Sequence, residues 1–438
     1  MLKRQAVVAG KFYPRSPSEL KSVIKKMVDS EAVREDVIGY YAPHAGYIYS
    51  GPVVGAVVSR IQLKDTFVII GPSHTGMGAP YSIMTDGIWE TPLGEVPVDA
   101  ILADTILAGC DILQKDTMAH SQEHAIEVQL PFIQYFKSDI KIVPIVLSQA
   151  SIEDYKKIGK AIAKAIKEYG KGVVIVASGD MTHYEPEKTA REKDMKAVDA
   201  MLKLDAEELL GRVRRFDISM CGYAPASVLI YAAKELGANT VELVKYMTSG
   251  ETTGDTASVV GYAGVIFKKH QESPQAKLAR ETVESYVKKR ILPELGEVSP
   301  EMQAAAGVFV CIHAGDDLRG CIGTIGPTKK NIAEEIMHNA VSSAMHDPRF
   351  PPISARELAG LNYSVDVLMP PEPVESEKDL DPKKYGVIVE SGARRGLLLP
   401  DLEGVDTAER QIEISKAKAG IEYNEPVKLY RFEVKRYK

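Results

Sequence analysis

The stretch Tyr41–Tyr47 reads YAPHAGY and decides how the front of this chain folds. It continues an apolar run, Val37–Tyr41 (VIGYY), that is typical of a β-strand, and apolar residues at helical spacing follow within Val53–Ile61. This order predicts a strand, a tight loop and a helix, with His44 directly after the carboxyl end of the strand. Because open α/β sheets bind ligands at that end of their strands, His44 is a candidate site residue.

The same pattern recurs further along the chain. The apolar run Thr66–Ile70 (TFVII) is followed by Gly71–His74 (GPSH), and a third run, Gly172–Ala177, leads into a polar segment that contains Asp180 and His183. Neighbouring parallel strands end at the same edge of a sheet. We therefore expect the side chains at these three strand ends to lie close together.

Three residues are candidate metal ligands: His44, His74 and Cys221. Neutral imidazole is the commonest metal ligand in proteins. Cys221 precedes a predicted helix, whose N-terminal end lowers the pKa of a thiol toward the metal-binding thiolate. Two imidazoles and one anion leave coordination positions open, as in mononuclear non-haem iron centres. The alternative is that each histidine is solvated or packed and that the cysteine is a small buried apolar residue.

Other titratable residues flank these candidates. Asp180 and His183 share the same sheet edge and are candidates for acid–base chemistry or for orienting a ligand. His120 and His124 lie on a predicted loop-to-helix turn and are candidates for another wall of the site. Two acidic residues of this turn are equally explained as capping and surface groups: Glu123 and Glu127.

The composition narrows the class of protein. The chain has 438 residues, a net charge of -6 and four cysteines. This length predicts two or three domains, and the mild charge gives no support to a nucleic-acid partner. So few cysteines do not form a disulfide framework and suit a reducing, cytoplasmic setting. No apolar run approaches the roughly 18 residues of a membrane span, so we expect no membrane partner.

The order of strands and helices predicts two domains. Residues 1–270 alternate strands and helices, which predicts an α/β domain with a mostly parallel or mixed sheet flanked by helices. The segment Lys268–Pro274 is the predicted linker. Residues 275–438 follow a different pattern, typical of a smaller α+β domain. Two local features are also expected in the first domain: a hairpin formed by residues 81–84 and 88–90, and a helix that is kinked or split at Pro131.

The second domain carries two motifs, LRGCIG at Leu318–Gly323 and DPRFPP at Asp347–Pro352. Arg319 is a candidate for holding a carboxylate or phosphate, and Cys321 is a candidate reactive thiol. The alternative is that Arg319 pairs with an acidic neighbour and that Cys321 packs. Cys311 can face Cys321 across a hairpin, but we expect no disulfide there in a cytosolic protein.

Five motifs make the first ~270 residues resemble the Memo family. They are Pro43–Tyr47 (PHAGY), Gly71–His74 (GPSH), Glu123–Glu127 (EHAIE), Ser178–His183 (SGDMTH) and Met220–Gly222 (MCG). Memo proteins are similar in fold to class III extradiol dioxygenases. The resemblance implies that His44, His74 and Cys221 bind a metal, iron(II) first and copper as an alternative, with Asp180 and His183 beside it.

These arguments assign roles to ten residues. The expected metal ligands are His44, His74 and Cys221, the expected catalytic residues are His183, Asp180 and His124, and the expected substrate contacts are Tyr47, His120, Arg319 and Cys321.

One departure limits the analogy with extradiol dioxygenases, because those enzymes complete their metal-binding triad with a carboxylate. A thiolate is softer and changes the redox character of a bound metal, so ring opening of catechols does not follow.

Residues ~275–438 resemble the AMMECR family through the motifs that contain Arg319 and Arg349. Prokaryotic members of the two families often occur alongside a radical-SAM protein, a grouping called the AmmeMemoRadiSam system. The chain has no CxxxCxxC cluster, so a separate radical-SAM partner is implied. The resemblance favours an iron- or copper-dependent oxidoreductase-like protein that acts on a small molecule or peptide. Two alternatives stay open: a peptide-binding scaffold without chemistry, and a zinc-dependent hydrolase.

Overall fold

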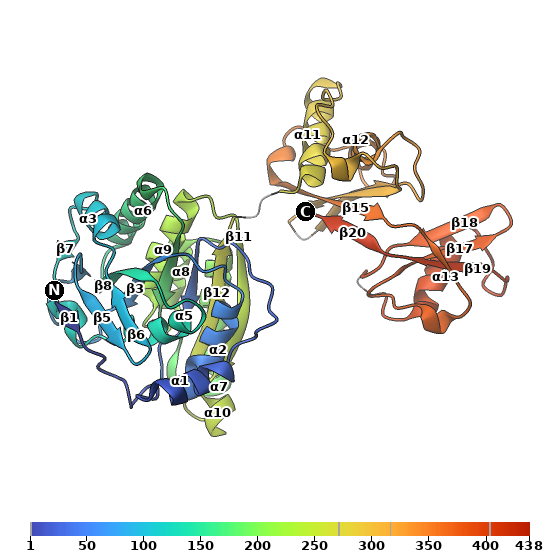
Figure 1. Cartoon of the computed structure of the whole chain (residues 1–438). Coiled ribbons are helices and arrows are strands. Elements are labelled where there is room, and N and C mark those ends of the chain that lie inside the picture. Colours follow the sequence, from blue (N-terminus) through green and yellow to red (C-terminus); the bar gives the residue numbers. More distant parts are fainter. Residues whose placement is uncertain (1, 270–271, 316, 403) are drawn as a thin grey trace. The chain divides into compact units, whose positions relative to one another are not determined.

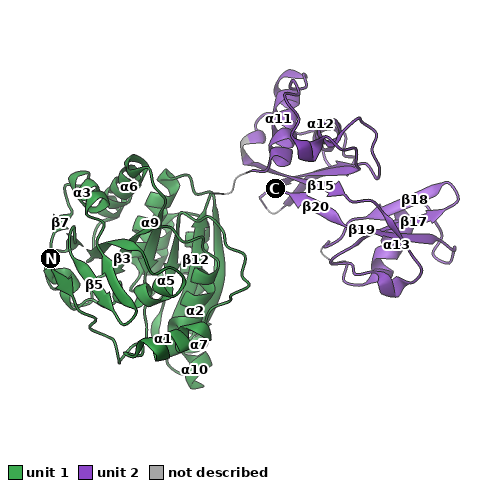
Figure 2. Ribbon diagram, viewed as in Figure 1, with its two compact units in different colours: residues 1–270 green, residues 271–438 purple. Residues whose placement is uncertain are grey.

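The structure, a computed structural model, describes residues 2–269, 272–315, 317–402 and 404–438. The chain divides into two units, Met1–His270 and Gln271–Lys438, which Figure 2 colours separately. The largest apolar core lies wholly in the first unit, and smaller cores lie in the second. The predicted linker contains residues 270 and 271, which lie outside the described residues.

A mixed sheet forms the centre of the first unit (Figure 1). Its nine strands, counted within the described residues, are β2 (Gly39–Ala42), β3 (Thr66–Pro72), β4 (Tyr81–Ile83), β7 (Gln114–Lys115), β8 (Lys141–Leu147), β9 (Val173–Ser178), β10 (His183–Glu185), β11 (Thr240–Thr248) and β12 (Val259–Lys268). The order is β10-β12-β2-β9-β3-β8-β4-β7, and β11 pairs with β12. Strands β2, β9, β3 and β8 run parallel, so their carboxyl ends share one edge.

Helices cover both faces of this sheet (Figure 1), as buried parallel strands require. One group comprises α1 (Pro17–Lys25), α2 (Tyr47–Ser59) and α5 (Leu130–Phe136). The other comprises α3 (Ala100–Ala108), α6 (Ile152–Tyr169), α7 (Glu187–Leu202), α8 (Ala206–Arg215) and α9 (Tyr223–Glu235). Short helices α4 (Met118–Ser121) and α10 (Gly250–Thr253) lie in loops. The α/β class expected from the sequence is confirmed.

Two local expectations in this unit have different outcomes. The hairpin of residues 81–84 and 88–90 is wrong, because β4 pairs antiparallel with β8 while β5 (Ile88–Thr91) joins a separate sheet with β1 (Lys3–Arg4) and β6 (Gly94–Pro97). That second pairing buries Trp89 completely. The split at Pro131 is confirmed: a 3₁₀ turn, η1 (Glu127–Gln129), precedes α5, and Pro131 stands in its first turn.

The second unit contains two four-stranded antiparallel sheets within the described residues. The first has the order β14-β13-β15-β20, with β13 (Val308–Ala314), β14 (Asp317–Gly323), β15 (Leu361–Leu368) and β20 (Val434–Tyr437). The second has the order β16-β19-β17-β18, with β16 (Glu372–Val374), β17 (Gly386–Ser391), β18 (Arg394–Leu398) and β19 (Lys428–Phe432). Helices α11 (Pro274–Lys289) and α12 (Ile332–Met345) pack on the first sheet, and α13 (Ala408–Lys418) packs on the second.

This arrangement confirms a smaller α+β domain. Strands β19 and β20 are separated by one residue, yet they join different sheets. Among the described helices of both units, none has the length and apolar character needed to cross a membrane.

Candidate metal centre

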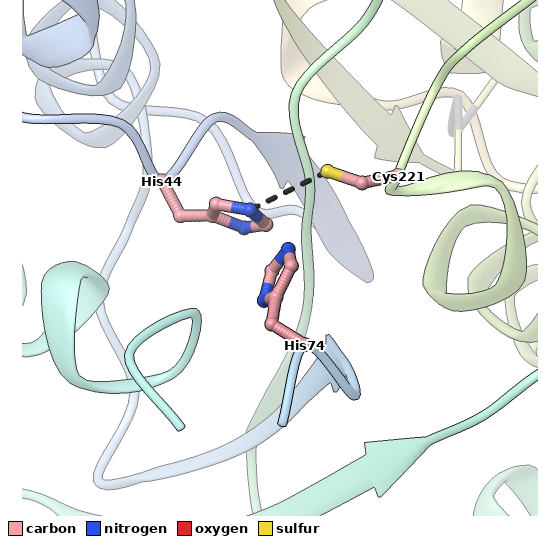
Figure 3. Close-up of side chains that lie close together, drawn as sticks. All are labelled: His44, His74 and Cys221. Atoms are coloured by element: carbon pink, nitrogen blue, oxygen red, sulfur yellow. Dashed lines mark hydrogen bonds between the residues drawn. The ribbon is translucent and has the colours of Figure 1, made fainter. Parts of the chain in front are cut away.

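The carboxyl edge of the main sheet brings the predicted ligands together. His44 follows β2, His74 follows β3, and Asp180 follows β9, which lies between those two strands. Cys221 reaches the same edge from the loop before α9. Figure 3 shows the two imidazole rings and the sulfur converging from these separate segments.

The distances fit a single small ion. His44 Nε2 lies 3.4 Å from Cys221 Sγ, and the ring centroids of His44 and His74 are 5.0 Å apart. One ligand atom from each of the three residues lies within 4.8 Å of the others. Metal–nitrogen and metal–sulfur bonds are about 2.0–2.3 Å long, so the three donor atoms are near the spacing that a shared ion requires.

Hydrogen bonds assign the tautomer of His44. Ser178 Oγ donates to the carbonyl of Ala125 at 2.6 Å, which uses its only hydrogen. It therefore accepts from Gln129 Nε2 at 2.9 Å and from His44 Nδ1 at 3.1 Å. With the hydrogen on Nδ1, the lone pair of His44 is on Nε2, the atom that faces Cys221. Burial, together with the nearby histidines, holds the pKa of His44 well below its usual range, so the ring is neutral.

His74 is oriented in the same way by a carboxylate. Its Nδ1 lies 2.9 Å from Glu123 Oε1, and its backbone N–H donates to Glu123 Oε2 at 2.7 Å. Burial acts to raise the pKa of Glu123, but the hydrogen bonds from His74 and from the backbone of Ala125 hold it below its usual value. The carboxylate thus fixes the hydrogen on His74 Nδ1 and leaves Nε2 free to bind a metal.

Cys221 is held by backbone contacts in a tight space. The Asp180 backbone N–H donates to its Sγ at 3.1 Å. A Cβ on Gly179 would lie 2.1 Å from the Cα of Gly222, so only glycine allows the Cys221 segment to approach this closely. The expected lowering of the thiol pKa by the helix end is wrong: burial, with the Asp180 charge, raises the pKa of Cys221 well above its usual value. A bound cation would oppose this shift.

The expected catalytic residues border the same space. Asp180 Oδ1 accepts from the His44 backbone N–H at 2.8 Å, and burial raises the pKa of Asp180 to about 6. His124 stacks on His74 with centroids 4.7 Å apart, and its Nδ1 lies 3.4 Å from Glu123 Oε1. His183 Nδ1 lies 2.8 Å from the carbonyl of Ser219, which leaves its Nε2 as an acceptor.

These groups open into a cavity of about 710 Å³, within the range of small-molecule sites. Its walls combine histidines and aromatic residues with polar residues from the loop around α10. The lining residues are Lys11, Phe12, His44, Ala45, Gly46, Tyr49, His74, His124, Asp180, His183, Tyr184, Ser249, Thr253, Asp255, Ser258, Val260 and Tyr262.

Two expected substrate contacts lie in the core instead. Tyr47 is buried, and its hydroxyl donates to the carbonyl of Val128 at 2.8 Å. His120 is also buried, and its Nε2 lies 2.9 Å from Ser82 Oγ. Neither residue lines the cavity. The structure contradicts both expected contacts, because the side chains of Tyr47, at the start of α2, and of His120, within α4, are packed in the interior.

The other two expected substrate contacts belong to the second unit. Arg319 pairs with Glu357 at 2.8 Å, which is the alternative that the sequence left open. Cys321 forms a disulfide with Cys311. The expected free thiol at Cys321 and the expected absence of a disulfide are therefore both wrong. The reason is the strand register, which sets these two cysteines directly opposite each other.

Sequence reasoning missed the residues that support the ligands. Arg4 is buried, pairs with Glu127, and donates from Nη2 to the Glu123 carbonyl at 2.5 Å and from Nε to the His120 carbonyl at 3.1 Å. It thereby holds the segment that carries Glu123 and His124. In the sequence, the signal for this support was Glu123, an acidic residue directly before His124 in a polar turn. No sequence feature pointed to Arg4.

Known proteins match the chain in two parts. The family model for Memo-like protein matches residues 4–266, and the model for AMMECR1 matches residues 276–437. A MEMO1 family protein from Methanococcoides burtonii is 46% identical over 267 residues, covering 60% of this chain and 100% of that protein. Another from Pyrobaculum aerophilum is 45% identical over 276 residues, covering 60% of this chain and 98% of that protein.

A solved structure is also similar. The crystal structure of an uncharacterised protein from Pyrococcus horikoshii matches 37% of this chain and 88% of its own, with 32% identity and a TM-score of 0.35. The family matches follow the division of the chain into its two units. The chain therefore belongs to the Memo family and carries an AMMECR1 domain at residues 276–437.

Proposed function

We propose that His44, His74 and Cys221 bind one metal ion, iron(II) first and copper as the alternative, in an oxidoreductase-like protein. One observation carries the proposal: Ser178 and Glu123 occupy the Nδ1 atoms of the two histidines, so both Nε2 lone pairs are free. Imidazole Nε2 atoms beside a thiol are the donors that iron, copper and zinc accept.

The remaining groups of the cavity supply proton transfer and orientation. A bound iron or copper ion would contribute redox chemistry at its open coordination positions. His183, with the hydrogen on Nδ1, presents Nε2 as a proton acceptor toward the cavity. Asp180 positions the His44 backbone and shares the cavity wall. His124 is held beside His74 by the same carboxylate and is a second candidate for moving a proton.

The cavity size supports a small molecule or a short peptide segment as the ligand. The fused AMMECR1 domain supports a place in the AmmeMemoRadiSam grouping, and hence a separate radical-SAM protein as the partner. The small number of cysteines supports the cytoplasm as the compartment. These three assignments are part of the proposal.

Two other functions have an observation in their favour. A zinc hydrolase would use the same three donors, because zinc commonly binds histidine and cysteine. A scaffold that captures a ligand without chemistry is favoured by the exposed aromatic rim of the cavity, where Tyr184 is 78% and Tyr49 is 37% exposed. Oxygen uptake by the iron-loaded but not the zinc-loaded protein would reject the hydrolase, and loss of all ligand capture in Cys221→Ser would count against the scaffold.

Metal analysis tests the proposal. The full chain is purified anaerobically, and bound metal is measured by mass spectrometry in the wild type and in His44→Ala and His74→Ala. We expect iron or copper near one ion per wild-type chain and a strong loss in both variants. His346→Ala, in the second unit, is the matched control and should keep the wild-type content. Equal metal in all four proteins would end the proposal.

A further inference from the structure

Two sequence motifs of the second unit have no role in the proposed function: LRGCIG at Leu318–Gly323 and DPRFPP at Asp347–Pro352. Residues of the two motifs contact each other at Cys321. The Cys321 backbone N–H donates to Asp347 Oδ2 at 2.8 Å, and Arg349 Nη2 donates to the Cys321 carbonyl at 2.9 Å. Asp347 and Arg349 are themselves paired at 2.7 Å, and the Asp347 side chain is buried. Both polar groups of the Cys321 backbone are therefore held by one ion pair.

Strand pairing brings a second cysteine to the same place. Cys311 on β13 lies directly opposite Cys321 on β14, with Cα atoms 4.1 Å apart, and the two form a disulfide. Opposite residues in a non-hydrogen-bonded antiparallel pair are about 4.5 Å apart whether or not a bond joins them. Strand β13 is also paired along its length with β15. The ladder therefore keeps the Cα atoms of the two cysteines close in either redox state.

The two cysteines are not enclosed in the apolar core under α12. Val308, Val310 and Ile312 of β13 are buried on the face covered by α12, whereas Cys311 alternates with them and points to the other face. Cys311 and Cys321 are both half-buried. Each cysteine residue therefore keeps part of its surface exposed in the folded unit.

We propose that Cys311 and Cys321 form a redox-active pair that exchanges with an external dithiol. The thiolate of the dithiol attacks one sulfur of the disulfide, the Cys311–Cys321 bond breaks, and the released cysteine leaves as a thiolate that takes up a proton. The second thiol of the reagent then displaces the other cysteine. The dithiol becomes a disulfide by losing two electrons and two protons, and the protein gains two thiols.

Dithiothreitol and its oxidised form provide the test. The full chain is equilibrated without denaturant at a series of ratios of the two forms, quenched in acid, unfolded and alkylated with iodoacetamide. Peptide mass spectrometry then reads the labelled fraction at each cysteine. We expect the labels at Cys311 and Cys321 to rise together from none to complete as the ratio increases, and to fall again when the oxidised form is restored. Cys110, a free thiol of the first unit, should be labelled in every sample.

Two results would overturn the proposal. Labelling of Cys311 and Cys321 in fully oxidised dithiothreitol would mean that the disulfide does not form. Reduction only after unfolding would mean that the disulfide is structural. Cys311→Ser provides the matched control, because Cys321 should then be labelled at every ratio. If Cys321 in this variant still followed the ratio, Cys311 would not be its partner and the proposal would fail.

Discussion

The carboxylate of Glu123 accepts hydrogen bonds from both the ring and the backbone of His74, at 2.9 and 2.7 Å. Glu123 is fully buried, and its Oε1 also lies 3.4 Å from His124 Nδ1. One side chain thus sets the tautomer of a proposed metal ligand and the position of a neighbouring histidine.

Glu123→Gln should therefore weaken metal binding without removing a ligand. A neutral amide holds the His74 ring less firmly than a carboxylate, and loss of such a partner typically costs roughly 10- to 100-fold in metal affinity. The affinity is measured by competition with a chelator. Glu187→Gln, on α7, is the control. An unchanged affinity in Glu123→Gln would show that Glu123 does not support the metal site.

Arg4→Gln should destabilise the first unit by about 3–5 kcal/mol, since it leaves the buried Glu127 carboxylate without its positively charged partner. The single tryptophan of the chain, Trp89, lies under the Arg4 guanidinium at 4.3 Å from the ring centroid. Urea unfolding followed by tryptophan fluorescence thus reports on this unit. Lys3→Gln, which breaks only exposed ion pairs, should change little. Similar losses in the two variants would argue against a special role for Arg4.

Gly179→Ala should abolish metal binding while Gly211→Ala should not. An added Cβ at Gly179 would lie 2.1 Å from Gly222 Cα, so the Cys221 segment would have to move away from the site. At Gly211, inside α8, a Cβ meets nothing within 4 Å, and alanine there should raise stability slightly. Metal content and urea unfolding check both variants. Normal metal content in Gly179→Ala would mean that the position of Cys221 does not matter.

Asp347 makes the stability of the second unit depend on pH. The hydrogen bond from Arg349 is the main cause that lowers the pKa of Asp347 to about 2, from an ordinary value of 3.8. A lowered folded-state pKa stabilises the fold above the ordinary value, and this contribution is lost as the pH falls from about 4 toward 2. We expect about 1–2 kcal/mol, reduced because Arg349 is 53% exposed.

Pulse proteolysis in urea, which separates the two units by fragment size, measures this difference. Asp347→Asn should be less stable than the wild type at pH 6, and the two should converge near pH 2. Glu297→Gln, at an exposed position of the same unit, should match the wild type throughout. A gap between wild type and Asp347→Asn that stays constant with pH would contradict the assignment.

The pattern of apolar runs in the sequence was enough to predict the candidate-site residues that follow strand ends. His44 and His74 each follow an apolar run, and parallel strands bring such ends to one edge. Cys221 was a candidate because it precedes a predicted helix, but no spacing relates it to the other two, and the family resemblance was needed to support the set of three. The pKa of its thiol was predicted in the wrong direction, since burial outweighs the effect of the helix end.

Partners far apart in sequence could not be predicted. Arg4 and Glu127 are 123 residues apart, and neither looks different from a surface charge in the sequence. The hairpin expected at residues 81–90 failed for a similar reason, because β5 finds its partners in β1 and β6. The Cys311–Cys321 disulfide follows from a strand register that the turn alone does not specify.

The most direct test of the metal site is a spectroscopic one. Iron(II) or copper is added anaerobically to the metal-free wild type and to Cys221→Ser, and the absorption spectrum is recorded with the bound metal measured in parallel. Coordination by Cys221 predicts a thiolate-to-metal band in the wild type that is lost in the variant. A wild-type protein that binds the metal without such a band, or a band that persists in Cys221→Ser, would contradict the proposed set of ligands.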